Sequence, residues 1–252
     1  MTTYNGGSGD NWFKAGGGDD WLDGGAGDDT LIGGQGNNTI LGGFGDDALK
    51  GGTGDDLLKG DDGNDYIVDN GGTNQIFGGA GNDYIDVLGK NTVFGEAGSD
   101  TILAGDGADS IDGGADNDVL WGFAGNDTII GGTGDDDITG GLGRDVLTGN
   151  AGADFFYFDD VKDSPSATPD LITDLTDEDT IYLKKIDANV NASGNQAFRL
   201  VDHFTHKAGE LTVTYDAAHN QTLVQGDVNG DGTADITIAL TGNHATFDNF
   251  VL

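Results

Sequence analysis

The chain has 252 residues, enough for one or two domains, and 48 of them are glycine. Acidic residues outnumber basic residues by 45 to 10, so the formal net charge is −35, and neither nucleic acid nor an anionic membrane is an expected partner. Cysteine is absent, which excludes disulfides and thiolate metal sites. A compact chain with this charge would repel itself unless cations neutralised it.

The first twelve residues have neither the basic nor the apolar region of a Sec signal peptide. No stretch approaches the run of about 18 apolar residues that a transmembrane helix needs. We therefore expect no membrane span.

A nine-residue repeat occupies residues 6–157 and is plainest in residues 24–32 (GGAGDDTLI) and 131–139 (GGTGDDDIT). Full units begin at residues 6, 15, 24, 33, 42, 51, 60, 69 and 78; one eight-residue unit, 87–94, follows; full units resume at 95, 104, 113, 122, 131, 140 and 149. A period of this kind is typical of a solenoid, in which each unit stacks on its neighbours.

The eighth position of every unit carries a large apolar residue. These residues are Phe13, Leu22, Leu31, Ile40, Leu49, Leu58, Ile67, Ile76, Ile85, Val93, Ile102, Ile111, Leu120, Ile129, Ile138, Leu147 and Phe156. Because no unit breaks the pattern, we predict one continuous apolar strip inside the solenoid.

The sixth position carries a side-chain oxygen in every unit. It is Asp20, Asp29, Asp47, Asp56, Asp65, Asp83, Asp100, Asp109, Asp118, Asp127, Asp136, Asp145 and Asp154 in thirteen units, and Asn11, Asn38, Asn74 and Asn91 in the other four. Hard cations such as calcium take six to eight oxygen ligands from carboxylates and carbonyls. The sixth positions are therefore the candidate metal ligands.

Glycines at the start of each unit allow positive φ and a sharp turn, whereas positions seven to nine are predicted to form a short strand. A strand of three residues is too short to be stable alone. Two units should therefore form one coil of 18 residues, with the loops of units n and n+2 stacked on each other. The prediction is an all-β, right-handed parallel β-roll over residues 1–157.

The repeat resembles the GGxGxDxUx nonapeptide of RTX (repeats-in-toxin) proteins over some 150 residues. The resemblance implies that calcium lies between loops n and n+2. Both position-six side chains would bind it, with the carbonyls of positions two and four from one loop and of positions one and three from the other. Asp29 and Asp47 would share one ion, and Asp127 and Asp145 another. Carbonyl donors at positions two and four would include Gly25, Gly27, Gly52, Gly54, Gly79, Gly81, Gly132, Gly134, Gly141 and Gly143.

Of the 15 pairs of units n and n+2, nine have Asp in both loops and five combine Asp with Asn, so we expect about nine to fourteen calcium ions in the roll. The remaining pair is Asn74 and Asn91, with Lys90 beside it. We predict a gap in the calcium column at this level. The stack itself should continue, because Ile76 and Val93 keep the apolar strip intact.

From residue 158 the glycines thin out, and residues 158–252 are expected to cap the last apolar rung. Residues 180–183, 210–215, 222–225 and 235–240 are predicted to be strands. Residues 170–175 (DLITDL), 179–183 (DTIYL) and 247–252 (FDNFVL) resemble the C-terminal region of serralysin-type secreted proteases. The resemblance implies an uncleaved signal read by type I secretion machinery, and hence an extracellular protein, with a bacterial cell surface as a further possible location.

Residues 227–235 (DVNGDGTAD) match the first nine positions of an EF-hand-type loop. Asp227, Asn229, Asp231 and Asp235 would supply side chains to calcium, and Thr233 a carbonyl. Position twelve is not Glu and the flanks are strand-like, so a true EF-hand is not expected. A lone calcium loop and a simple hairpin turn both remain open.

No HExxH, GxSxG or P-loop motif is present. We expect a secreted, non-enzymatic calcium-binding module that folds in extracellular calcium. One alternative is a carbohydrate-binding module like the repeat modules of mannuronan C5-epimerases, with a polysaccharide or another cell-surface component as partner. The repeats hold only five basic residues, which disfavours an anionic polymer. The other alternative is the C-terminal part of a larger secreted hydrolase.

Overall fold

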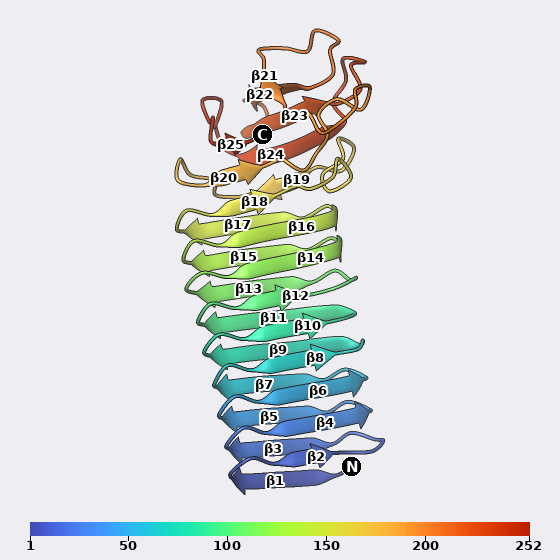
Figure 1. Cartoon of the computed structure of the whole chain (residues 1–252), viewed down its shortest axis with the longest axis vertical. Helices are drawn as coiled ribbons and strands as arrows, with labels where there is room; N and C mark the ends of the chain where they lie inside the picture. The colour runs from blue at the N-terminus through green and yellow to red at the C-terminus, as the bar shows by residue number, and fades with distance from the viewer.

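A computed structural model describes all residues from 1 to 252 and contains 25 strands and no helix. The strands form a 14-stranded sheet and an 11-stranded sheet, and the chain alternates between them from β1 to β20 (Figure 1). None of its segments is a helix that could cross a membrane.

The first sheet contains, in spatial order, β1 (Thr3–Ser8), β3 (Trp21–Ala26), β5 (Thr39–Phe44), β7 (Leu57–Asp62), β9 (Thr73–Ala80), β11 (Lys90–Ala97), β13 (Ser110–Ala115), β15 (Thr128–Thr133), β17 (Val146–Ala151), β19 (Asp170–Ile172), β24 (Ile236–Thr241), β23 (Gln221–Asp227), β22 (Glu210–Asp216) and β21 (Arg199–Leu200). The second contains β2 (Trp12–Lys14), β4 (Thr30–Gln35), β6 (Ala48–Thr53), β8 (Tyr66–Asp69), β10 (Tyr84–Val87), β12 (Thr101–Leu103), β14 (Val119–Gly125), β16 (Asp137–Gly143), β18 (Phe155–Tyr157), β20 (Thr180–Tyr182) and β25 (Phe250–Val251).

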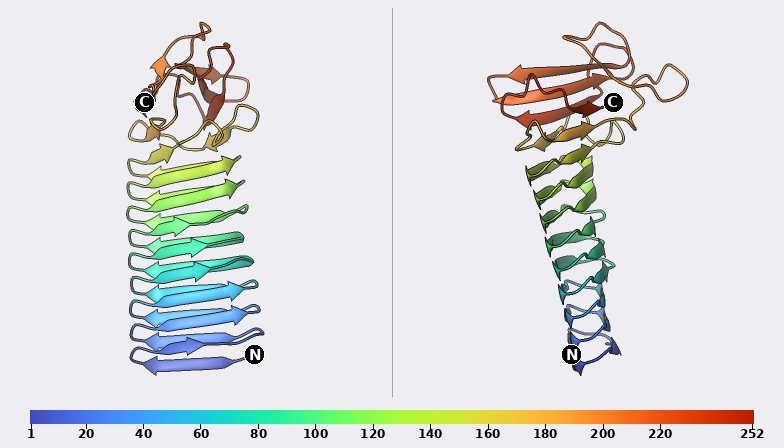
Figure 2. Two further views of the ribbon diagram at one scale, coloured as in Figure 1. Left: turned by 45° about the vertical axis from the view of Figure 1, so that its right-hand side comes forward. Right: turned by 60° about the vertical axis from the view of Figure 1, so that its left-hand side comes forward.

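Each strand of the repeats pairs in parallel with a strand one coil further along the chain. Leu22 lies opposite Ile40, and Ile129 opposite Leu147, so the coil has 18 residues. Figure 2 shows the result, a narrow two-layer stack with the N-terminus at one end and the C-terminal part at the other. The predicted all-β parallel roll is confirmed.

The position-eight side chains fill the space between the two sheets. From Leu22 to Phe156 each of them is at most 1% exposed. Phe13, at the N-terminal end, is half-buried, and Tyr4 stacks on it with ring centroids 4.2 Å apart. The predicted apolar strip is thus confirmed.

The strands are longer than predicted. β3, β5 and β15 have six residues each, because they include positions one to three of the following unit. Pairing between coils uses only backbone groups, so it continues through the glycines, and Gly25 lies opposite Gly43. Side chains alternate between the faces of a strand, so position one points inward like position eight.

The eight-residue unit does not interrupt the stack. β11 lies opposite β9, with Asn91 opposite Asn74 and Val93 opposite Ile76, an offset of 17 residues instead of 18. The offset of 18 returns at the next coil, where Val93 lies opposite Ile111. The stack continues through the shortened loop, as predicted from the apolar strip.

Both sheets continue past residue 157. Ile172 lies opposite Leu147, and Ile181 opposite Phe156, so the C-terminal part adds further rungs to the stack. β24 then lies parallel to β19, and β23 and β22 follow antiparallel. The four strands predicted after residue 158 are confirmed as β20, β22, β23 and β24. A domain boundary at residue 157 stays a prediction.

Candidate calcium-binding loops

The ten glycines expected to supply carbonyls lie at strand ends or in the turns that follow them, and all have a positive φ. Their φ angles lie between 94° and 151°, a region that residues with a Cβ rarely adopt. A Cβ on Gly132 would also lie less than 3.0 Å from the carbonyl oxygen of Gly114, the equivalent residue one coil earlier. Glycine is therefore required both for the turn and for the close approach of stacked loops.

The position-six side chains form two columns, one through the odd-numbered and one through the even-numbered units. The backbone N–H of Asp29 donates to Oδ1 of Asp47 at 2.7 Å, and the N–H of Asp127 to Oδ1 of Asp145 at 2.8 Å. The same bond joins position six of unit n to that of unit n+2 at every other level except between Asn74 and Asn91. The structure thus brings together both pairs named in the sequence analysis.

The second carboxylate oxygen has no partner. Oδ2 of every position-six Asp is buried and accepts no hydrogen bond, and each of these residues is at most 3% exposed. An ionised carboxylate in such a place carries a large desolvation penalty unless a cation pairs with it.

Burial raises the pKa values of eleven of these carboxylates, although a hydrogen bond from the stacked backbone N–H opposes the effect. The pKa rises to about 7 for Asp47, Asp83, Asp109, Asp118 and Asp145, and to about 6 for Asp65, Asp100, Asp127, Asp136 and Asp154. Proton or cation uptake would relieve the same desolvation penalty.

The glycine at position one leaves open the space that these oxygens face. A Cβ on Gly24 would lie less than 3.0 Å from Oδ2 of Asp29 and from the carbonyl oxygen of Gly42, the position-one residue of the stacked loop. Each regular loop therefore offers a carboxylate and a carbonyl oxygen around one small space, which is the donor chemistry of calcium. No three His, Cys, Asp or Glu side chains converge as a metal site, so a cation here would draw other ligands from carbonyls.

Asparagine at position six brings a hydrogen-bond donor in place of the second oxygen. Nδ2 of Asn38 donates to the Gly36 carbonyl at 3.0 Å, and Nδ2 of Asn11 to the Gly9 carbonyl at 2.5 Å. These are position-four carbonyls, which the RTX resemblance assigns to calcium. The amide therefore competes for a ligand as well as lacking charge.

Two acids of the C-terminal part, Asp170 and Asp179, extend the columns, although neither was predicted from the sequence as a candidate ligand. The N–H of Asp145 donates to Asp170 at 2.7 Å, and that of Asp154 to Asp179 at 3.0 Å. Oδ2 of Asp170 is buried and unpaired, and burial raises its pKa to about 8, whereas Oδ2 of Asp179 accepts the Thr176 N–H. Each of these acids lies 25 residues after its partner in the column, so the 18-residue period does not predict it. The one sequence feature that could have pointed to them is an Asp placed before alternating apolar residues.

The position-five side chains form a second, exposed ladder of hydrogen bonds that was not predicted from the sequence. The N–H of Asp46 donates to Oδ1 of Asp28 at 3.0 Å, and the N–H of Asn64 donates to Oδ1 of Asp46 at 2.8 Å. Here the side chain of the earlier unit accepts, the reverse of position six. Both residues of an Asp-Asp pair therefore join stacked loops, but only the inner one, at position six, also keeps a buried oxygen without a partner.

Comparison with known families gives a match over most of the chain. The model of the family described as Peptidase M10 serralysin C terminal matches residues 21–252. The chain belongs to this family. The resemblance to serralysins stated for residues 170–175, 179–183 and 247–252 is thereby confirmed. The match also includes residues 21–157 of the repeat region.

Relatives of this serralysin C-terminal chain include Metalloprotease AprA of Pseudomonas entomophila, at 35% identity over 94 residues. That alignment covers 37% of this chain and 19% of AprA, so the chain spans a minor part of that relative. Similar solved structures include the AlgE6R3 subunit of the Azotobacter vinelandii mannuronan C5-epimerase, with 24% identity and a TM-score of 0.31. The alignment covers 69% of this chain and 80% of the AlgE6R3 chain. Extracellular lipase LipA from Serratia marcescens has 18% identity and a TM-score of 0.34, and the alignment covers 91% of this chain and 45% of the lipase.

The 227–235 loop of the serralysin C-terminal chain joins β23 to β24 and is closed by its own hydrogen bonds. Both oxygens of Asp227 accept backbone N–H groups. Asn229 donates to Asp235 at 2.9 Å, and Asp231 accepts the Thr233 N–H at 2.8 Å. In contrast to the columns, no carboxylate oxygen here is both buried and unpaired. A calcium ion in this loop stays a prediction.

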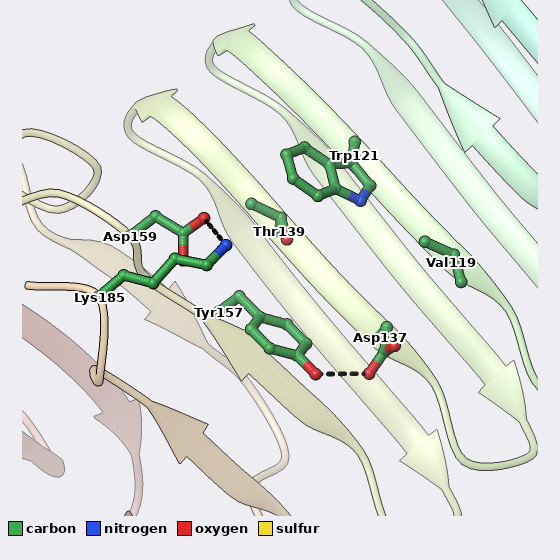
Figure 3. Close-up of a pocket in the computed structure, with 7 residues that line it drawn as sticks. All are labelled: Val119, Trp121, Asp137, Thr139, Tyr157, Asp159 and Lys185. Carbon is green, nitrogen blue, oxygen red and sulfur yellow. Dashed lines mark hydrogen bonds and ion pairs between the residues drawn. The ribbon is translucent and has the colours of Figure 1, made fainter. Parts of the chain in front are cut away.

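A cavity of about 120 Å³ lies on the outer face of the second sheet, where the repeats meet the C-terminal part (Figure 3). It is lined by Val119, Trp121, Asp137, Thr139, Tyr157, Asp159 and Lys185. The Tyr157 hydroxyl donates to Asp137 at 3.0 Å, and the Lys185 ammonium pairs with Asp159 at 2.6 Å. The cavity thus combines aromatic surface with hydrogen-bond acceptors, and its one cation is already paired.

Proposed function

We propose that this chain is a secreted, non-enzymatic calcium-binding module whose repeats fold on meeting extracellular calcium after type I export. The observation that carries the proposal is the set of buried position-six Oδ2 atoms without a partner in both columns. Stacked carbonyl oxygens lie beside them as further donors. The same role applies to the module alone or at the end of a larger secreted hydrolase.

Charge makes the calcium-free roll costly to form. Residues 6–157 contain 29 acids and 5 bases, a net charge of −24, and stacking brings many of the acids close together. Because no such site exists in an unfolded chain, the energy of calcium binding becomes energy of folding. Extracellular modules bind calcium at roughly 10⁻⁴–10⁻³ M, so the chain would stay unfolded where calcium is scarce.

Circular dichroism of the full chain tests calcium-driven folding. We expect the strand signal to be lost in EDTA and restored by millimolar calcium. Magnesium at the same concentration is the control, because it demands a small octahedral site and keeps its water ligands. A chain that keeps its full strand signal in EDTA would contradict the proposal.

The C-terminal tail supports export through its resemblance to type I signals. In the folded chain Phe250 lies opposite Ile181, and Val251 opposite Tyr182, at the edge of the second sheet. Deleting residues 248–252 should trap the chain inside cells that carry a type I exporter. Deleting the exposed loop residues 191–195 is the matched control. Undiminished secretion of the tail-less chain would refute this route.

The cavity beside Trp121 supports a second candidate function, the binding of polysaccharide. An aromatic surface with a few hydrogen-bonding groups is typical of a ligand pocket. Because Lys185 is paired and Asp137 faces the same space, a neutral glycan suits the cavity better than an anionic one. Trp121→Ala should abolish retention on neutral glycans without changing circular dichroism in calcium. Equal retention of the variant would exclude this cavity.

A further inference from the structure

Unit 69–77 departs from the repeat at position one, where Asp69 stands in place of glycine. Its carboxylate is buried, with 2% of the residue exposed. In a regular loop, the open space at a position-one glycine is flanked by the position-six Oδ2 and a carbonyl of the stacked loop. At Gly51 both neighbours are carboxylates, because a Cβ there would lie less than 3.0 Å from Oδ2 of Asp56 and Oδ2 of Asp69. Asp69 therefore puts a carboxylate where other loops have a carbonyl.

Hydrogen bonds hold Asp69 in this orientation. Its Oδ1 accepts the Gly71 N–H and Nδ2 of Asn74, both at 2.9 Å, and its Oδ2 accepts the Gly52 N–H at 3.0 Å. Asp56 is 3% exposed, and its Oδ2 has no partner. Burial, with a smaller contribution from the facing Asp56 carboxylate, raises the pKa of Asp69 to about 7. Two buried carboxylates thus converge on one space.

The next level of the same column is closed by amides. Nδ2 of Asn74 also donates to Oδ1 of Asn91 at 3.0 Å. Nδ2 of Asn91 donates to the carbonyls of Gly89 and Ala104 at 3.1 and 3.2 Å. At this level the side-chain amides of Asn74 and Asn91 therefore take the place of the unpaired Asp Oδ2 atoms found at other levels, and position six supplies no carboxylate.

We propose that Asp69 is a calcium ligand, which forms a two-carboxylate site with Asp56 between units 51–59 and 69–77, beside a cation-free level at Asn74 and Asn91. The inference rests on the proposed calcium-binding function. Position six supplies only one carboxylate to this site, since Asn74 stands opposite Asp56, and Asp69 supplies the second. The even-numbered column is thus divided at mid-length, whereas Asp65, Asp83 and Asp100 keep the odd-numbered column continuous.

Native mass spectrometry of the full chain in saturating calcium counts the bound ions. Asp69→Asn keeps the shape of the side chain but removes its charge, and it should hold one ion fewer than wild type. Asp62→Asn is the matched control, because Asp62 is exposed and its side chain makes no hydrogen bond. It should bind as many ions as wild type. Equal counts for wild type and Asp69→Asn would overturn the site.

A crystal structure of the wild-type chain grown in calcium gives a readout that needs no variant. An ion in contact with Oδ2 of both Asp56 and Asp69 supports the proposal. An ion on Asp56 without Asp69, or an ion between Asn74 and Asn91, overturns it. If the wild-type chain takes up no calcium, the proposed function fails as a whole. If it takes up calcium but Asp69 touches no ion, only the Asp69 site fails.

Discussion

The backbone N–H of Asp29 donates to Oδ1 of Asp47 at 2.7 Å, while Oδ2 of Asp47 is buried without a partner. One carboxylate thus fastens a loop to the loop one coil away and directs its remaining charge into the space between them. The same relationship recurs along both columns. Stacking therefore creates a repulsion between carboxylates that cation binding would remove.

Replacing Asp47 by Asn should raise the calcium concentration at the midpoint of folding by on the order of tenfold, since calcium affinity follows the number of charged ligands. Asp47 contributes to two levels, with Asp29 and with Asp65. Asp46→Asn is the matched control, because Asp46 is exposed and an amide oxygen can equally accept the Asn64 N–H. Calcium titrations followed by circular dichroism give both midpoints, and equal midpoints would contradict the assignment of position six.

Without calcium, the roll should lose stability as pH rises from about 4 to about 7. Burial raises the pKa of Asp118 to about 7 and that of Asp65 to about 6, above the ordinary value of 3.8. The folded chain therefore binds more protons than the unfolded chain in this window, and its free energy of unfolding falls as the protons leave.

Circular dichroism in EDTA should accordingly show more strand at about pH 4.5 than at about pH 7.5. In saturating calcium the order should reverse, because calcium needs the deprotonated carboxylates. A strand signal in EDTA that grows with pH would show that the position-six acids are not buried in the calcium-free state.

Leu120→Ala should lower the free energy of unfolding in saturating calcium by about 2–5 kcal/mol. Leu120 is fully buried and lies opposite Ile102 and Ile138, so its removal leaves a cavity in the apolar strip. Leu142→Ala is the control, because Leu142 is 49% exposed. Denaturant titrations compare the two variants. A loss for Leu120→Ala as small as that for Leu142→Ala would mean that the strip adds little to stability.

Gly132→Ala should destabilise the calcium-loaded roll by about 1–3 kcal/mol. Gly132 has a φ of 123°, and a Cβ there would overlap the carbonyl oxygen of Gly114. Gly16 is the matched position-two control, since its φ is not positive and a Cβ would meet no atom within 4 Å. Thermal unfolding in saturating calcium measures both variants, and a neutral Gly132→Ala would argue against tight stacking of the loops.

Periodicity alone was sufficient to predict the apolar interior and the stacking of the position-six side chains into columns. In a stacked repeat, a residue at a given position has the same kind of neighbours in every coil. Leu120 could therefore be placed inside, and Asp127 paired with Asp145, from spacing and residue type. The strand lengths were underestimated, because backbone pairing extends through glycines that have no strand propensity of their own.

The exceptions to the period became visible only once the chain was folded. Asp170 joins the even-numbered column from 25 residues beyond Asp145, because residues 158–169 form no strand and lengthen the connection from β18 to β19, which adds the next rung. Asp69 meets Asp56 because the coil carries a position-one side chain into the space at Gly51. Such contacts depend on the path of the chain in three dimensions. A repeat pattern predicts that path only where the residues keep to the repeat.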